Sequence, residues 1–108
     1  MRQSGSVGLM AHRLSPQART DLDRIWDYIV TNGGSEDIAN RQIDSITARF
    51  YLLTSHPRIG RARDDDLGQG MRTFPVGNYV IVYCIEGNDV LILRVAHGRQ
   101  NLIALFGH

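Results

Sequence analysis

Three short β-type segments follow one another in the second half of the chain, with a glycine-asparagine pair in each gap. The segments cover residues 71–76, 79–85 and 90–97, and the gaps contain Gly77-Asn78 and Gly87-Asn88. Glycine and asparagine between apolar runs are typical of tight hairpin turns, because both residues tolerate the positive φ angles that such turns need. The pattern therefore predicts an antiparallel meander of three strands, against which the rest of the chain has to pack.

The segment before the meander has the pattern of two amphipathic helices. Ser15-Pro16 predicts the start of the first helix, since serine caps helices and proline suits the first helical position. Asn32-Gly33-Gly34 ends this helix, Ser35 caps the next, and His56-Pro57 ends that one because the residue before proline leaves the helical region. Asp21 is expected on the polar face of the first helix. The expected buried stripes are Ala18, Leu22, Ile25, Trp26 and Ile29, and then Ala39, Ile43, Ile46, Phe50 and Leu53.

The order of these segments predicts an α+β fold. An antiparallel helix hairpin is packed on one face of a small antiparallel β-sheet, in the order β-α-α-β-β-β with a short C-terminal helix. The first strand is expected over residues 11–14 and the last helix over 101–106, and the polar, charged segment 58–70 is expected to be a surface loop. Residues 1–10 are expected to be a disordered leader or cloning remnant, and residues 11–108 a single domain.

The last two strands carry apolar side chains on both faces. Strict alternation over residues 90–97 places Val90, Ile92, Arg94 and Ala96 on one face and Leu91, Leu93, Val95 and His97 on the other. A small antiparallel sheet usually exposes one polar face to water. Either the C-terminal segment 101–106 folds over the second apolar face, or another protein covers it.

Composition excludes several classes of protein. Twelve arginines and eleven acidic residues give a formal net charge of +1, so the chain lacks the basic field that would by itself hold nucleic acid. The single cysteine, Cys84, excludes an internal disulfide framework and favours a reducing compartment. We expect a cytoplasmic protein, because no apolar run is long enough for a membrane helix or a secretory signal.

Common catalytic and metal-binding signatures are absent. The sequence contains no glycine-rich phosphate loop, no GxSxG or HExxH motif, and no cysteine pair. The four histidines lack the spacing of a metal site, and the acidic run Asp64-Asp65-Asp66 is expected to be solvated. We therefore expect no metal and no cofactor.

The arginines and one histidine of the last strand are the remaining candidates for chemistry. Arg94 lies in the middle of an apolar strand, where an unpaired charge is costly to bury, so it either pairs with a carboxylate or faces an open groove. His97, at the end of that strand beside Gly98 and Arg99, has two interpretations. It is a general acid or base with arginines bracing a phosphate, or it is an ordinary strand-end histidine.

Four stretches of the chain resemble the ParE toxins of the RelE/ParE superfamily, which belong to bacterial type II toxin–antitoxin systems. They span Ala11 to Phe106 in order, and they read HRLSPQARTDLDRIWDYI, RFYLLTSHPRIGRARDD, MRTFPVGNYVIVYCIE and ILRVAHGRQNLIALF. The resemblance implies the fold given above.

The resemblance also implies a function. ParE toxins inhibit DNA gyrase by binding it, without catalytic residues, and a co-encoded ParD antitoxin holds them inactive in a hetero-oligomeric complex. ParD combines a DNA-binding domain with a tail that folds on the toxin, so contact with DNA is expected only through the antitoxin. No membrane or small-molecule ligand is implied.

RelE-type relatives share the fold and cleave messenger RNA on the ribosome. The alternatives are therefore such an endoribonuclease, with His97 transferring the proton and Arg72 and Arg94 on the phosphate, and a degenerate relative that only binds antitoxin.

The resemblance leads to two groups of candidate binding residues. Because the HGR ending is associated with ParE, the residues expected to contact the target are Arg94, His97 and Arg99. Three apolar or aromatic residues lie off the two helical stripes and need cover, so they are expected to bind the antitoxin or to pack against the loop 58–70. These residues are Tyr28, Tyr51 and Leu52.

Overall fold

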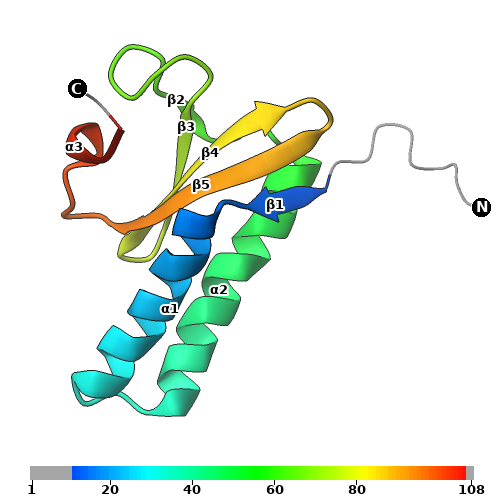
Figure 1. The fold of residues 1–108 in the computed structure, drawn as a ribbon. Helices are drawn as coiled ribbons and strands as arrows, with labels where there is room; N and C mark the ends of the chain where they lie inside the picture. The colour runs from blue at the N-terminus through cyan, green and yellow to red at the C-terminus, as the bar shows by residue number, and fades with distance from the viewer. Residues whose placement is uncertain (1–10, 107–108) are drawn as a thin grey trace, which may run out of the picture.

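The computed structural model describes residues 11–106 of the chain. The expected leader at residues 1–10 lies outside the described residues. Two long helices lie side by side on one face of a twisted sheet, and a short third helix follows the last strand (Figure 1). The elements are β1 (His12–Leu14), α1 (Pro16–Thr31), α2 (Glu36–Ser55), β2 (Arg61–Ala62), β3 (Arg72–Val76), β4 (Tyr79–Glu86), β5 (Asp89–His97) and α3 (Leu102–Phe106).

The helix hairpin forms where the sequence predicts it. The side chains of Ser15 and Ser35 each accept a hydrogen bond from a backbone N–H in the first turn of their helix, and Gly33 takes the turn between the helices with a φ of 94°. The buried positions of α2 are Ala39, Ile46, Phe50 and Leu53, all on the predicted stripe. Within residues 11–106, no helix is long and apolar enough to cross a membrane.

The sheet has the order β1-β5-β4-β3-β2. The predicted meander is confirmed, since β3, β4 and β5 pair antiparallel with their neighbours. However, β1 pairs with β5 in parallel, with His12 opposite Val90 and Leu14 opposite Ile92, so the sheet is mixed and not wholly antiparallel. The two hairpins already fix the direction of β5. The whole helix hairpin lies between β1 and the meander, which leaves enough chain for a parallel pairing.

The segment 58–70 is more ordered than the predicted surface loop. Its residues Arg61 and Ala62 form β2, which pairs with the start of β3, and Leu67 is buried. The acidic run is exposed, as expected, and two of its carboxylates are also bonded: Asp64 Oδ1 accepts the Gly70 N–H at 2.7 Å, and Asp66 pairs with Arg63 at 2.7 Å. That pairing lowers the pKa of Asp66. Charged side chains of the segment 58–70 therefore form hydrogen bonds and an ion pair within that segment.

A β-bulge in β5 breaks the predicted alternation. Val82 is opposite Arg94 while the next residue of β4 is opposite Ile92, so one residue of β5, Leu93, has no partner. One extra residue moves every later side chain to the other face. Val95 therefore joins Val90 and Ile92 in the core against the helices, and strict alternation is wrong beyond Ile92.

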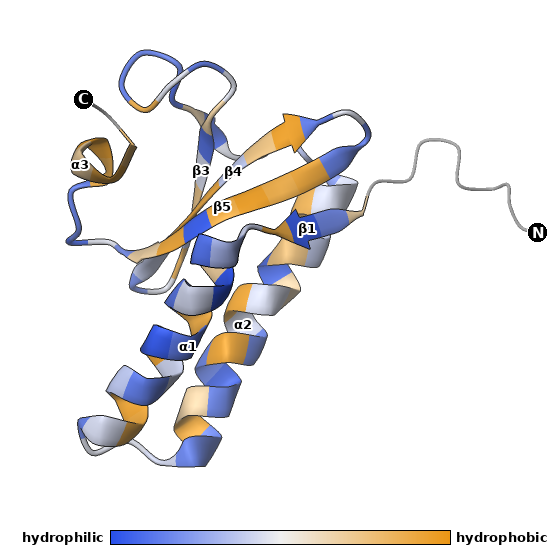
Figure 2. Ribbon diagram, viewed as in Figure 1, coloured by the Kyte–Doolittle hydropathy of each residue, from blue (hydrophilic) through white to orange (hydrophobic). Residues whose placement is uncertain are grey.

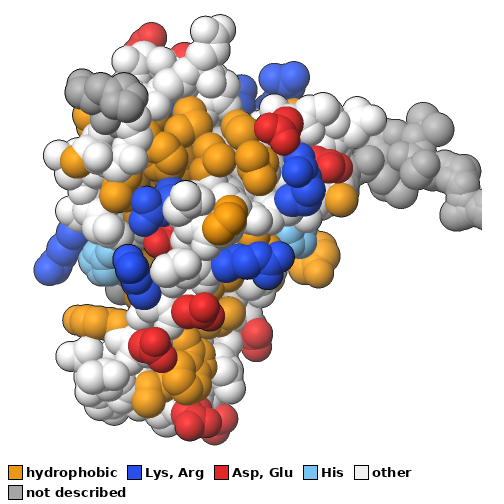
Figure 3. All heavy atoms as spheres, viewed as in Figure 1, with side chains coloured by type: hydrophobic (Ala, Val, Ile, Leu, Met, Phe, Trp, Pro, Cys, Tyr) orange, Lys and Arg blue, Asp and Glu red, His pale blue; other side chains and the backbone are white. Residues whose placement is uncertain are grey.

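The opposite face of the sheet is apolar and only partly covered. β4 and β5 are hydrophobic along most of their length (Figure 2), and hydrophobic side chains gather over this face (Figure 3). The C-terminal segment, one of the two covers considered above for this face, lies over one end of it. Leu102 and Ile103 border a groove of about 670 Å³ whose other wall includes Thr73, Pro75 and Val80.

Candidate functional site

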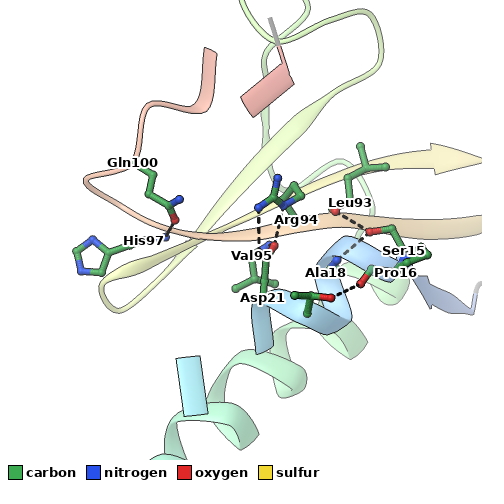
Figure 4. Close-up of polar contacts among 10 residues, drawn as sticks. Ser15, Pro16, Ala18, Asp21, Leu93, Arg94, Val95, His97 and Gln100 are labelled. Carbon is green, nitrogen blue, oxygen red and sulfur yellow. Dashed lines mark hydrogen bonds and ion pairs between the residues drawn. The ribbon is translucent and has the colours of Figure 1, made fainter. Parts of the chain in front are cut away.

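Arg94 forms an ion pair with Asp21 across the helix–sheet interface (Figure 4). Its Nε donates to Oδ2 of Asp21 at 2.8 Å and its Nη2 donates to Oδ1 at 3.0 Å. The same Oδ2 accepts the Val95 N–H at 2.9 Å. The side chains are 20% and 8% exposed, respectively, and the hydrogen bond to Asp21 raises the pKa of Arg94. Of the two alternatives for Arg94, the structure therefore shows the ion pair with a carboxylate.

Asp21 is buried, so its predicted place on the polar face of the first helix is wrong. The reason is tertiary: β1 ends at Leu14, so beyond Ile92 the edge of β5 that faces β1 has no strand partner among the described residues, whereas β4 continues along the other edge. The start of α1 takes that place. Ser15 Oγ donates to the Leu93 carbonyl at 2.7 Å, and Asp21 accepts the N–H of Val95. The buried edge of β5 thus gets its hydrogen-bond partners from a helix.

A second arrangement lies where β5 ends. A cavity of about 450 Å³ opens between α1 and the ends of β4 and β5. Ile25 and Val95, both buried, form its apolar part. We name the cavity and its polar lining the strand-end site, and the polar lining is Arg24, Tyr28, Tyr79, His97, Arg99 and Gln100.

Hydrogen bonds fix the turn that carries His97. Its Nδ1 accepts the Arg99 N–H at 3.1 Å, and its own N–H donates to Oε1 of Gln100 at 2.8 Å. Because Nδ1 is an acceptor, the neutral imidazole carries its proton on Nε2. The Gly98 N–H donates to the backbone carbonyl oxygen of Asn78 at 2.7 Å. A Cβ on residue 98 would lie 3.2 Å from that oxygen. The His97-Gly98-Arg99 sequence therefore builds one compact turn.

The structure regroups the predicted binding residues. Tyr28, expected to bind antitoxin, lines the same cavity as His97 and Arg99, expected to bind the target. Tyr51 lies elsewhere, with its ring 4.9 Å from the His12 ring near the start of β5, and Leu52 beside it is half-buried. The three predicted antitoxin residues therefore do not form a single patch.

Sequence reasoning missed three residues of the strand-end site. Two of them left weak signals: Arg24 is one helical turn before Tyr28, and Tyr79 pairs with His97 once the hairpin register is known. The rings of Tyr79 and His97 meet edge to face at 5.5 Å. Gln100 carried no signal, because its role depends on the shape of the turn.

The residues of the alternative nuclease do not converge. Arg94 is held by Asp21, and Arg72 donates through Nη1 to the carbonyls of Arg58 at 3.1 Å and Gly60 at 2.6 Å. Arg72 pairs with Tyr83 and His97 pairs with Tyr79, four residues apart on β4. Arg72 and His97 therefore sit on different strands at different ends of the sheet.

Comparison with known proteins identifies the family. The family described as "ParE toxin of type II toxin-antitoxin system, parDE" matches residues 13–102. The toxin ParE3 of Caulobacter vibrioides is 41% identical over 87 residues, covering 81% of this chain and 85% of the relative. ParE1 of the same organism is 34% identical over 96 residues, covering 89% and 97%. A solved chain of the chromosomal ParDE system from P. aeruginosa has the same fold, with a TM-score of 0.72 at 23% identity, over 83% of this chain and 97% of that chain. The chain belongs to the ParE toxin family of type II toxin–antitoxin systems.

Proposed function

We propose that this toxin inhibits DNA gyrase by binding it through the strand-end site, and that a cognate ParD-type antitoxin neutralises it. Membership of the ParE family supports the general role. One observation carries the site: His97 and Arg99, held in a hydrogen-bonded turn, border an open cavity between α1 and the sheet. A preformed concave site with a few polar groups is what a binding function requires.

Binding without catalysis is the better reading of the geometry. Cleavage of a phosphodiester needs a proton-transfer group and cationic groups around one phosphate. The two sheet arginines considered for that task, Arg72 and Arg94, are occupied by backbone carbonyls and by Asp21. His97 stands apart from both, beside tyrosines and the exposed Arg99. We therefore assign His97 and Arg99 to target contact and Arg94 to support of the strand that carries them.

The antitoxin is proposed to cover both exposed tyrosines of the helix hairpin. Tyr28 and Tyr51 are 65% and 67% exposed. They lie near the opposite ends of β5, so a segment that reaches both has to span the seven residue steps from Val90 to His97, roughly 23 Å at about 3.3 Å per step. A tail that folds on the toxin suits such a length. Leu52, next to Tyr51, supplies apolar area at one end.

The gyrase part is tested with purified toxin released from its antitoxin. Toxin is titrated into a supercoiling reaction, and trapped DNA cleavage is scored on the same gel. We expect loss of supercoiling with accumulating cleaved DNA, reversed by ParD. His97→Ala should abolish the effect in a folded protein, whereas His56→Ala, at an exposed histidine far along the chain, should not. Unaffected gyrase together with messenger RNA cut on ribosomes would replace this proposal by the endoribonuclease.

The antitoxin part is tested by measuring the affinity of ParD for two toxin variants. Tyr51→Ala should weaken binding by about tenfold or more, as expected for an aromatic residue in an interface. Ile38→Ala is the matched control, because Ile38 is also an exposed apolar residue of α2, in its first turn. Equal affinities of the two variants would remove Tyr51 from the antitoxin interface.

A further inference from the structure

We propose that the strand-end site binds a carboxylate of a partner protein, presented beside an apolar side chain. The inference rests on the proposed function, because it gives the chemistry by which the site would recognise its target. It names the class of group that is bound, which family membership does not supply.

Four side chains of the strand-end site, His97, Gln100, Arg24 and Arg99, leave hydrogen-bond donors free. His97 and Gln100 each have one acceptor atom, and the turn uses both: Nδ1 of His97 accepts the Arg99 N–H, and Oε1 of Gln100 accepts the His97 N–H. What remains on these side chains is the Nε2–H of the imidazole and the amide NH₂ group. Arg24 and Arg99 have donors only. A site that offers donors selects a ligand with acceptors.

The charge around the cavity is also unbalanced. Within residues 11–106, neither Arg24 nor Arg99 has a carboxylate at ion-pairing distance. Asp21, which reaches the apolar wall by accepting the Val95 N–H, is already paired with Arg94. Two cations line the same concave site, one from α1 and one from the turn after β5, and together they can hold a single anionic group.

The two tyrosines add donors and apolar surface. Tyr28 and Tyr79 both border the cavity. Burial raises the pKa of Tyr79, and the neighbouring Tyr28 raises it further, so the Tyr79 hydroxyl stays protonated and able to donate. Ile25 and Val95 line the same cavity and are 8% and 3% exposed. An apolar side chain next to the bound carboxylate would therefore remove further apolar surface from water.

A protein carboxylate fits these features better than the phosphate backbone of a nucleic acid. A nucleic acid presents regularly spaced charges and is held by a basic stripe, whereas this chain has twelve basic and eleven acidic residues. Asp23 and Asp27 are exposed on the same helix as Arg24 and would repel the next phosphates. The volume of about 450 Å³ is at the small end of ligand sites, which span roughly 300–1,000 Å³, and suits one or two side chains.

The test uses two blocked dipeptides and purified toxin. N-acetyl-leucyl-glutamine amide and N-acetyl-leucyl-glutamate amide have nearly the same shape and differ in charge. In an NMR titration, we expect the glutamate peptide to shift the ring signals of His97 and Tyr79 with a dissociation constant of about 1–10 mM. The glutamine peptide should bind about tenfold more weakly. Equal binding of the two peptides, shifts that map elsewhere, or no saturable shift with glutamate would overturn the proposal.

Matched variants locate the effect in the site. Arg99→Gln should weaken binding of the glutamate peptide by about fivefold to tenfold, whereas Arg41→Gln, at an exposed arginine of α2, should leave it unchanged. His97→Asn keeps an acceptor near the position of Nδ1 for the Arg99 N–H and removes the Nε2–H donor. A loss of binding in a variant whose turn signals are preserved would assign that donor to the carboxylate.

Two further outcomes distinguish the carboxylate site from a phosphate site and from the proposed gyrase target. If a short duplex DNA shifts the same His97 and Tyr79 signals at lower concentration than the glutamate peptide, the site takes phosphate and the proposal is overturned. The peptide titration needs no gyrase. Binding of the glutamate peptide by a toxin that leaves supercoiling intact would therefore support the carboxylate site and contradict only the gyrase target.

Discussion

Replacing Asp21 by alanine tests how strongly the helix hairpin is fixed to the sheet. The substitution removes three hydrogen bonds at once, two from the Arg94 guanidinium and one from the Val95 N–H. It leaves a largely buried guanidinium and a buried N–H without their acceptor. The perturbation is therefore the loss of one partner of a buried pair, which is the costly way to break such a pair.

The size of the effect follows from burial. Removing one partner of a buried pair costs about 3–5 kcal/mol, and an unsatisfied backbone N–H about 1–3 kcal/mol. These costs overlap. They are also reduced because the Arg94 side chain is 20% exposed and can turn toward water. We expect a loss of about 3–4 kcal/mol from a total of roughly 5–15 kcal/mol for a domain of this size.

Urea denaturation followed by circular dichroism measures this loss. With an m value of about 1–1.5 kcal/mol/M, the midpoint should fall by roughly 2–4 M. Glu86→Ala is the control, because its ion pair with Arg13 is more than half exposed on both sides and should contribute at most about 1 kcal/mol. In a double-mutant cycle, Asp21 and Arg94 should show a coupling of about 1.5 kcal/mol or more. If Asp21→Ala costs no more than Glu86→Ala, the proposed anchoring is refuted.

Three further changes have defined outcomes. Ser15→Ala should cost about 1–2 kcal/mol of unfolding free energy in the same urea assay, because the hydroxyl both caps α1 and donates to β5. Gly60→Ala should cost about 1–3 kcal/mol, since a Cβ there would collide with the Tyr83 hydroxyl and a neighbouring carbonyl, and it should cost less in a Tyr83→Phe background. Burial lowers the pKa of His12 below its ordinary 6.5, so the unfolded state takes up the proton first and stability falls as pH drops below about 6.5. Melting curves between about pH 7.5 and 5.5 should show this loss in the wild type and in His56→Gln but less of it in His12→Gln, and an unchanged slope in His12→Gln would contradict the assignment.

Local patterns in the sequence determined the elements of this protein. Ser15-Pro16 and Ser35 mark helix starts wherever the rest of the chain lies, because capping depends on backbone groups within one turn. The glycine-asparagine pairs mark the two hairpins for the same reason, since a turn needs only its own φ angles. The helix hairpin, the meander and the family resemblance followed from such short-range features.

Only the tertiary structure decided how these elements support a site. The parallel pairing of β1 depends on which edge of β5 is free. The bulge at Leu93 moves the later side chains of β5 to the opposite face. Asp21 looked like a surface acid because its partners, Arg94 and Val95, lie more than seventy residues away. The strand-end site likewise joins one face of α1 to a turn at the far end of the chain. Such contacts depend on packing and on hydrogen bonds at strand edges between segments far apart in the sequence. The pattern of apolar and polar residues within one segment therefore cannot predict them.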